Sequence, residues 1–188
     1  MSKGNAIRII SGAQRGRRMP VLDLPGLRPT GNRQREVLFN WLQGHIVGAR
    51  CLDVFAGTGA LALEALSRDA REVVCLENNE SASQALQGVL DEWGLAGRAE
   101  VHAVDALWFL GHSAPRVFDI VFIDPPFDAD SWQATLDALV VGWIRSGSLI
   151  YLEYPAPHLP VRMPADWRVA KARTAGRIGM TLFEAAIA

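Results

Sequence analysis

The residues Asp124-Pro125-Pro126-Phe127 follow an apolar run that starts at Phe118, and they combine an acid, two prolines and an aromatic ring. Proline lacks an N–H and has a fixed φ, so a central strand ends before Pro125, and Asp124 is held extended. The Asp124 carboxylate and the Pro125 carbonyl can accept the two N–H groups of a planar amine, while Phe127 stacks on the ring that carries it. Positioning of this kind can lower a barrier by about 7–11 kcal/mol. These four residues are the candidate catalytic residues, and a strand-end turn capped by Asp124 is the structural alternative.

Two glycines and two acids lie at the ends of three other predicted strands. Gly57 and Gly59 stand where a strand meets a helix, and glycine there allows positive φ and close approach of the backbone to a ligand. Glu77 follows Gly59 by eighteen residues and ends the next strand, where an acid can accept both ribose hydroxyls of an adenosine. Asp105 ends the third strand and can accept from the adenine amino group. Each acid alone fits a solvated loop or a helix N-cap, but their repetition at successive strand ends favours an adenosine site.

The same loop distinguishes between two kinds of adenosine cofactor, a dinucleotide and S-adenosyl-L-methionine. The third glycine of a dinucleotide-binding pattern is missing, because Ala62 occupies its position, and the loop has no phosphate-binding lysine. Nearby carboxylates such as Asp53 and Asp124 favour a positively charged sulfonium. The predicted cofactor is therefore S-adenosyl-L-methionine, and no metal site is expected. The candidate cofactor-binding residues at these strand ends are Asp53, Phe55, Ala56, Gly57, Gly59, Glu77, Asn78, Asp105 and Ala106.

An alternation of strand and helix patterns must bring these strand ends together. Strands separated by helices form a mostly parallel, doubly wound sheet, which binds ligands beyond the carboxyl ends of its strands. After a proline-rich connector, an antiparallel hairpin with a loop at 174–177 is predicted to close the chain. The predicted fold class is thus α/β. The predicted strands are 50–55, 72–77, 99–104, 118–123, 148–154, 167–172 and 178–185, and the predicted helices are 32–43, 60–67, 80–93, a turn through 110, and 131–141.

The first 50 residues carry a strong positive charge. They hold nine basic side chains, eight of them arginine, and two acids, whereas the rest of the chain holds ten basic and eighteen acidic side chains. Arginine forms planar, bidentate contacts with phosphate, so this arm predicts a polyanionic partner; a solvated basic surface is the alternative. We divide the chain into a basic arm with a hairpin at 1–30 and a domain at 31–188. The candidate RNA-binding residues are Arg8, Arg15, Arg17, Arg18, Arg28 and Arg35.

The composition excludes several classes of protein. Hydrophobic residues make up 49% and charged residues 21% of the 188 residues, as in ordinary globular proteins. No apolar run approaches the roughly 18 residues of a membrane helix, and the N-terminus lacks the apolar region of a signal peptide. Cys51 and Cys75 lie in apolar runs and are expected to be reduced. We therefore expect a cytoplasmic protein without a membrane partner.

Together these segments resemble a known family. Asp124 to Phe127 looks like the acceptor motif of amino-group methyltransferases, and Asp53 to Leu61 looks like their cofactor motif. The N-terminal run is more specific and resembles the bacterial 16S rRNA (guanine(966)-N2)-methyltransferase family. This run comprises Ile7-Arg8-Ile9-Ile10-Ser11-Gly12, Arg15-Gly16-Arg17, Gly26-Leu27-Arg28-Pro29-Thr30, Arg33 and the segment from Arg35 to Leu42.

The resemblance implies a Rossmann-like, seven-stranded class I methyltransferase sheet with an added N-terminal β-hairpin. It also implies methyl transfer to guanine N2 of 16S rRNA, presented in the small ribosomal subunit or its assembly intermediate. By the same resemblance, Thr30 and Arg33 lie near the cofactor cleft. Two departures are mild: Thr58 stands where serine is expected, and Asn78 stands where an acid is common.

Two other functions remain open at this point. Asp-Pro-Pro-aromatic motifs also serve adenine N6, so the residues from Asp124 to Phe127 do not choose the base, and an N6-adenine methyltransferase of RNA or DNA is the first alternative. A non-catalytic RNA-binding assembly factor is the second, although the retained acids disfavour it. We expect a monomer.

Overall fold

The structure is a computed structural model that describes residues 6–21, 31–126, 131–159 and 161–186. The predicted helices and strands are present, with ends shifted by a few residues. The helices are α1 (Asn32–Trp41), α2 (Ala60–Ser67), α3 (Glu80–Glu92), α4 (Ala106–His112) and α5 (Trp132–Leu139), with a 3-10 turn at Ala96–Arg98. The strands are β1 (Ala6–Arg8), β2 (Arg18–Pro20), β3 (Arg50–Asp53), β4 (Glu72–Glu77), β5 (Ala99–Ala103), β6 (Ile120–Ile123), β7 (Leu149–Pro155), β8 (Arg168–Ala175) and β9 (Ile178–Glu184).

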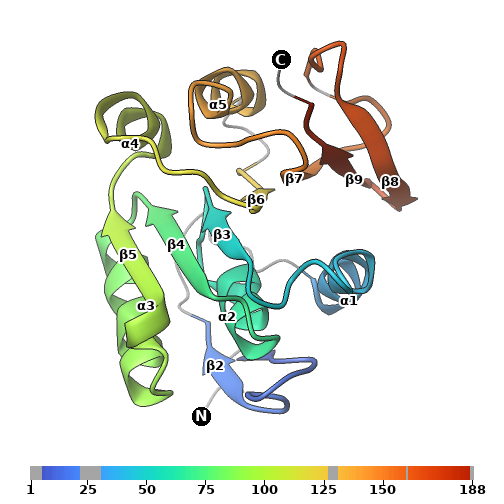
Figure 1. Cartoon of the computed structure of the whole chain (residues 1–188). Helices are drawn as coiled ribbons and strands as arrows, with labels where there is room; N and C mark the ends of the chain where they lie inside the picture. The colour runs from blue at the N-terminus through green and yellow to red at the C-terminus, as the bar shows by residue number, and fades with distance from the viewer. Residues whose placement is uncertain (1–5, 22–30, 127–130, 160, 187–188) are drawn as a thin grey trace.

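Seven strands form one sheet in the order β5-β4-β3-β6-β7-β9-β8. The first five of these strands run parallel, and β9 pairs antiparallel with both β7 and β8. The chain moves outward in one direction from β3 to β5 and in the other from β6 to β8, so the order reverses between β3 and β6 (Figure 1). The predicted α/β class and the doubly wound sheet are confirmed. Ligands of such sheets bind beside this reversal.

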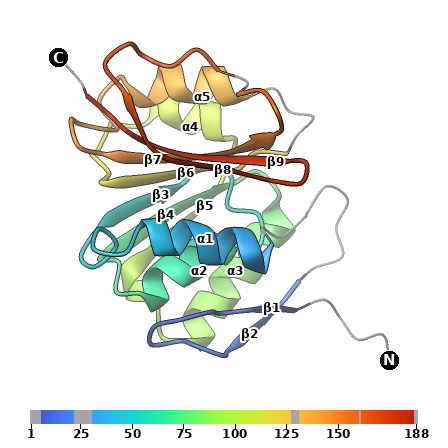
Figure 2. The same cartoon turned by 90° about the vertical axis from the view of Figure 1, so that its right-hand side faces the viewer.

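Helices cover both faces of the sheet (Figure 2). Helices α1, α2 and α3 lie on one face and α4 and α5 on the other. Strand residues alternate between two buried clusters: Cys51, Phe122 and Tyr151 pack on the side of α1–α3, whereas Leu52 and Val121 pack on the side of α4 and α5. This alternation follows from the two-residue period of a strand, and it fixes the face on which each strand-end side chain lies.

The N-terminal hairpin, predicted within residues 1–30, is short and packs closely on the domain. β1 and β2 pair antiparallel over three residues each, outside the layer of α2 and α3 (Figure 2). Ile7, Ile9 and Met19 are buried in the same cluster as the residues of α2. The hairpin is thus held by the core that also carries the sheet.

The C-terminal hairpin is longer than predicted. β8 continues to Ala175 and the turn shrinks to Gly176 and Arg177, with Gly176 at a φ of 63°. Glycine occupies this left-handed region without the strain that a Cβ brings, so the two strands can be joined by two residues. The shorter turn brings Arg173 and Thr174 into the sheet.

Candidate functional site

Four carboxyl side chains lie on one face of the sheet at the carboxyl ends of neighbouring strands. Asp53 ends β3, Glu77 ends β4, Asp124 follows β6, and Glu153 lies near the end of β7. Each is two residues beyond a residue that packs toward α1–α3, so all four side chains point to that face. In the strand register, Asp53 is level with the residues two positions before Glu77, Asp124 and Glu153. These three acids therefore lie nearer the carboxyl ends of the strands than Asp53 does. The site is therefore a row of three acids with a fourth beneath them.

Asp53 is the deepest of these acids. Its side chain is 1% exposed, and neither carboxylate oxygen has a hydrogen-bond partner among the described residues. Burial, followed by the negative charge of Asp124, raises the pKa of Asp53 to about 8; the nearby N–H of Ala62 opposes the shift without forming a well-shaped hydrogen bond. A buried carboxylate without donors costs free energy. This side chain is thus prepared for a partner that the described residues do not supply.

Glu77 ties two loops of the site together. One of its oxygens accepts from the N–H of Gly57 at 2.7 Å and the other from the N–H of Asn79 at 2.8 Å. Each carboxylate oxygen has a further lone pair, so both can still accept a hydroxyl. Asn79 caps α3 by accepting from the N–H of Ala82, and Asn78 beside it is exposed. The carboxylate of Glu77 therefore fixes the glycine loop while remaining able to bind a ribose.

The glycine loop has the backbone that its sequence predicts. Gly57 and Gly59 have φ values of 53° and 79°, in the left-handed region. Gly59 is also the N-cap residue of α2, and a Cβ there would collide with Leu86 of α3. Phe55 is half-buried and Ala56 is buried. Gly59 thus serves both the turn and the packing of α3 against the loop.

Asp105 has a defined local role. It is the N-cap of α4, and its carboxylate accepts from the N–H of Trp108 at 2.8 Å. Asp105 is exposed, and Ala106 after it is buried. The structure therefore contains the helix cap that was the alternative for this acid. The side chain still faces the solvent, and its contact with an adenine stays a prediction.

The acceptor segment leaves the sheet beside a fourth acid that the sequence did not single out as a site residue. Asp124 is half-buried, Pro125 is buried and Pro126 is exposed, while the predicted stacking residue Phe127 lies outside the described residues. Glu153 is 4% exposed and accepts from the hydroxyl of Tyr151 at 2.7 Å. Burial, followed by the negative charge of Asp124, raises the pKa of Glu153 to about 8. A lone acid in the otherwise apolar run of β7 was the signal available for it.

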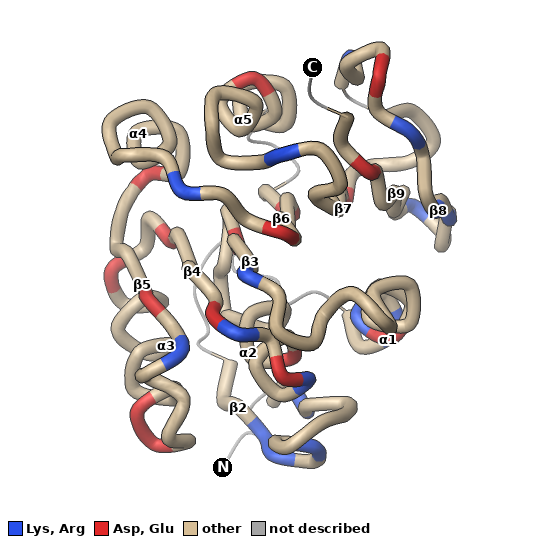
Figure 3. The backbone as a smooth tube through the Cα atoms, viewed as in Figure 1, with Lys and Arg blue, Asp and Glu red and all other residues tan. Residues whose placement is uncertain are grey.

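Most of the predicted RNA-binding arginines line the hairpin (Figure 3). Arg8, Arg15 and Arg18 are exposed. Arg17 is half-buried because its guanidinium lies 4.5 Å from the ring centre of Trp93 and 3.5 Å from a carboxylate oxygen of Glu92. Among the other predicted site residues, Arg33 is exposed at the start of α1, whereas Arg28 and Thr30 lie outside the described residues.

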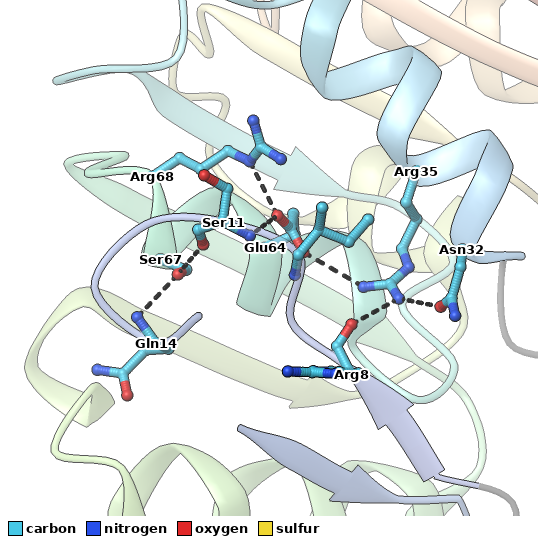
Figure 4. Close-up of polar contacts among 9 residues, drawn as sticks. Arg8, Ser11, Gln14, Asn32, Arg35, Glu64, Ser67 and Arg68 are labelled. Atoms are coloured by element: carbon cyan, nitrogen blue, oxygen red, sulfur yellow. Dashed lines mark hydrogen bonds and ion pairs between the residues drawn. The ribbon is translucent and has the colours of Figure 1, made fainter. Parts of the chain in front are cut away.

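The prediction that Arg35 binds RNA is wrong. Its side chain has no exposed surface and forms an ion pair with Glu64 at 3.4 Å. It also donates to the carbonyl of Arg8 at 2.9 Å and to Asn32 (Figure 4). Burial lowers the pKa of the guanidinium, and the charge of Glu64 opposes that shift. Arg35 joins α1 to β1 and has no surface to offer a nucleic acid.

Glu64 is the centre of this buried network (Figure 4). It accepts from the backbone N–H groups of Ile10 and Ser11 at 2.9 and 3.0 Å, and it pairs with Arg68 at 2.9 Å. One helical turn later, Ser67 accepts from the N–H of Gln14 and donates to the carbonyl of Ser11. Helix α2 thus holds the segment between β1 and β2 by side chains that are themselves buried.

In the described ranges, no cluster of three or more His, Cys, Asp or Glu side chains could hold a metal ion. No helix in the described part of the chain is long and apolar enough to cross a membrane.

Comparisons with known proteins agree with this geometry. The family model described as Conserved hypothetical protein 95 matches residues 7–184. The chain is 42% identical to Ribosomal RNA small subunit methyltransferase D of Escherichia coli, over 97% of this chain and 92% of the relative. It is 39% identical to the protein of that name in Haemophilus influenzae, over 95% and 93%. The solved structure of the Escherichia coli protein yhhF superposes with a TM-score of 0.86 at 41% identity, covering 97% of this chain and 99% of that structure.

Proposed function

Because the chain belongs to the Conserved hypothetical protein 95 family, we propose that it is a methyltransferase of small-subunit ribosomal RNA. Its two curated relatives named above are ribosomal RNA small subunit methyltransferases, and they cover nearly the whole chain at about 40% identity. The base that it modifies is guanine, at the exocyclic N2. The observation that carries this function is the row of acids at the strand ends, which retains every carboxylate that the reaction needs.

S-adenosyl-L-methionine is the cofactor, and the residues of the site fit it. A cationic ligand would stabilise the ionised form of Asp53, whose pKa burial and the charge of Asp124 raise to about 8 and whose oxygens have no hydrogen-bond partner among the described residues. Glu77 keeps lone pairs for the ribose hydroxyls. Positive φ at Gly57 shapes the loop over which the ligand lies. When bound, the cofactor supplies an electrophilic methyl group on a sulfonium sulfur.

The acceptor segment orients the amino group and takes its proton. The Asp124 carboxylate and the Pro125 carbonyl accept the two N–H groups of guanine N2, so that the nitrogen lone pair points away from them toward the methyl group. With the cofactor held by Asp53 and Glu77, this lone pair would take up its methyl group, and the electrons of the broken C–S bond would leave on sulfur. The nitrogen gains positive charge, which Asp124 stabilises, and the excess proton moves to the Asp124 carboxylate and then to water. Phe127 stacks on the base.

The hairpin supplies part of the contact with RNA. Arg8, Arg15 and Arg18 are exposed there, and arginine suits bidentate contact with phosphate. The target base must leave its stack to reach Asp124, which costs a few kcal/mol in a duplex and less in a loop. We propose a monomer that works in the cytoplasm on the small ribosomal subunit or its assembly intermediate.

Methyl transfer to the natural particle tests this function. Small ribosomal subunits from a strain without the enzyme are incubated with the protein and tritium-labelled S-adenosyl-L-methionine, and the product nucleosides are separated. The expected product is N2-methylguanosine. N6-methyladenosine would identify the adenine alternative. A protein that shows no binding of S-adenosyl-L-methionine by titration calorimetry, and no transfer, would instead be the non-catalytic assembly factor.

A further inference from the structure

The hairpin formed by the last two strands places three basic side chains near the carboxyl ends of the parallel strands, where the acids lie. Lys171, Arg173 and Arg177 are exposed on β8 and on the turn that follows it. β8 is one of the two edge strands of the sheet, and Figure 3 shows basic residues along it. The predicted hairpin of basic residues lies elsewhere, below α2 and α3 (Figure 2). The chain therefore has a second basic surface, which we call the β8 edge and define as Lys171, Arg173 and Arg177.

The register connects the β8 edge to the acceptor residue. Arg173 pairs with Met180 of β9, and Met180 pairs with Glu153 of β7. Glu153 is level with Asp124, one residue beyond the pair formed by Ile123 and Leu152. Since neighbouring strands are about 4.8 Å apart, the backbone of Arg173 lies roughly 15 Å from that of Asp124.

The β8 edge also faces the correct way. Side chains that pair across antiparallel strands lie on the same side of the sheet. Lys171 pairs with Leu182 and Arg173 with Met180, and both partners pack on the side of α1–α3. This is the face that carries the row of acids. Arg177 lies in the turn beyond the carboxyl end of β7, since Ile178 pairs with Pro155.

Among the described residues, the cations of the β8 edge have no acidic partner. In the part of the chain that the structure describes, no ion pair involves Lys171, Arg173 or Arg177, whereas Arg168 at the opposite end of β8 pairs with Glu184. Charged side chains on an edge strand also prevent pairing with the sheet of another molecule. That function does not require the charges to lie at one particular end of the strand. On β8 and its turn, the cations without an ion pair among the described residues thus lie from the middle of the strand to the end beside the acceptor site.

From these observations we propose that the β8 edge binds the phosphates of the RNA strand that flanks the nucleotide held at Asp124. This inference rests on the proposed function and extends it. The RNA then contacts the protein on two sides of the site, at the hairpin and at the β8 edge. Each phosphate contact releases counterions, so its contribution declines as salt rises.

The test compares two triple variants of the full chain with equal changes of charge. The first replaces the β8 edge, as Lys171→Gln, Arg173→Gln and Arg177→Gln. The control replaces Arg71, Arg116 and Arg145 by Gln. These residues precede β4, β6 and β7, so they lie at the amino ends of the strands, away from the acids. The ion pairs of Arg116 and Arg145 are partly exposed, so their loss changes stability little. A third variant, Arg173→Lys with Arg177→Lys, keeps the charge.

Binding to unmethylated small ribosomal subunits is measured between 50 and 200 mM salt, together with KM and kcat for methyl transfer. The salt slope is the slope of the logarithm of the binding constant against the logarithm of the salt concentration. For three lost contacts, its magnitude is expected to fall by about 2 in the β8-edge variant, and KM at 50 mM salt should rise by about tenfold or more. The kcat and the cofactor affinity should stay unchanged. The control and the lysine variant keep the wild-type slope.

Two failures can be told apart in this experiment. If the wild type methylates the subunits and the β8-edge variant has the same salt slope and KM as the control, the β8 edge does not bind RNA. If the wild type transfers no methyl group at all, the proposed function fails instead. Loss of cofactor binding by the β8-edge variant would show misfolding, and the lysine variant then decides: a slope lowered despite its retained charge would overturn the proposal.

Discussion

Glu64 and Asp53 are both buried carboxylates in the same domain, and their surroundings are opposite. Glu64 accepts hydrogen bonds from two backbone N–H groups and pairs with Arg35 and Arg68. Asp53 has no hydrogen-bond partner among the described residues, and the charges that raise its pKa are those of the acids Asp124 and Glu77.

The contrast separates structural acids from site acids. A buried charge that is fully paired and hydrogen-bonded fixes the elements around it, as Glu64 fixes α2, α1 and the segment after β1. A buried acid without donors weakens the fold and persists where a ligand uses it. The number of partners is thus a better guide to the role of an acid here than its burial, and four variants test this distinction.

The largest effect is expected at Asp124 in the site region. Asp124→Ala removes the acceptor of the amino N–H and of the proton, and kcat should fall by at least about 10²–10³-fold. Affinity for S-adenosyl-L-methionine, measured by titration calorimetry, should stay within about twofold, a difference of roughly 0.4 kcal/mol. Equal losses of turnover and of cofactor binding would contradict the assigned role.

Glu64→Gln should show the reverse pattern. Removing this charge leaves the buried guanidinium of Arg35 unpaired, which costs about 3–5 kcal/mol, so Tm should fall by roughly 6–20 °C in a chain of this size. Thermal unfolding of Glu92→Gln is the matched control, because the pair of Glu92 with Arg17 is exposed and worth about 1 kcal/mol or less. If both variants unfold at similar temperatures, the network of Glu64 is not a structural centre.

Asp53→Asn should weaken the ligand and strengthen the fold. The ionised form of Asp53 favours the sulfonium, so above pH 8, where this form predominates, affinity for S-adenosyl-L-methionine should fall by about tenfold, or 1.4 kcal/mol. Because the folded pKa is raised to about 8 from 3.8, the wild type binds more protons than the unfolded chain between these values and loses stability as pH rises through them. The variant avoids this loss, so its Tm should exceed that of the wild type at pH 8 and match it near pH 4. A Tm below the wild type at pH 8 would show that Asp53 is stabilising.

The smallest effect is expected for Glu153→Gln. Its pKa is raised to about 8 from 4.5, so the wild type again loses stability as pH rises between these values. The hydroxyl of Tyr151 partly offsets this loss, and the gain in Tm at pH 8 should be smaller than for Asp53→Asn. Thermal unfolding at pH 5 and pH 8, with the exposed Asp91→Asn as control, measures it. An unchanged pH dependence would place Glu153 with the structural acids.

The sequence predicted the elements well and the site in part. Helix α2 and strand β4 were predicted with the bounds that the structure has, because periodicity, glycine and helix propensity are local properties. The strand-end acids Asp53, Glu77 and Asp124 were found for the same reason. The roles of single residues within the site stay predictions, and Phe127, Thr30 and Arg28 lie outside the described residues.

The sequence by itself determined the order of strands and helices, the glycine loop and the acids at the strand ends, since each depends on residues close together in the chain. Only the tertiary structure decided which charges are used inside the protein. Arg35 meets Glu64 across 29 residues, and Glu153 joins the row of acids through the pairing of β6 with β7. A charge is structural or functional according to its partners in space, and a sequence does not state those partners until the register between its strands is known.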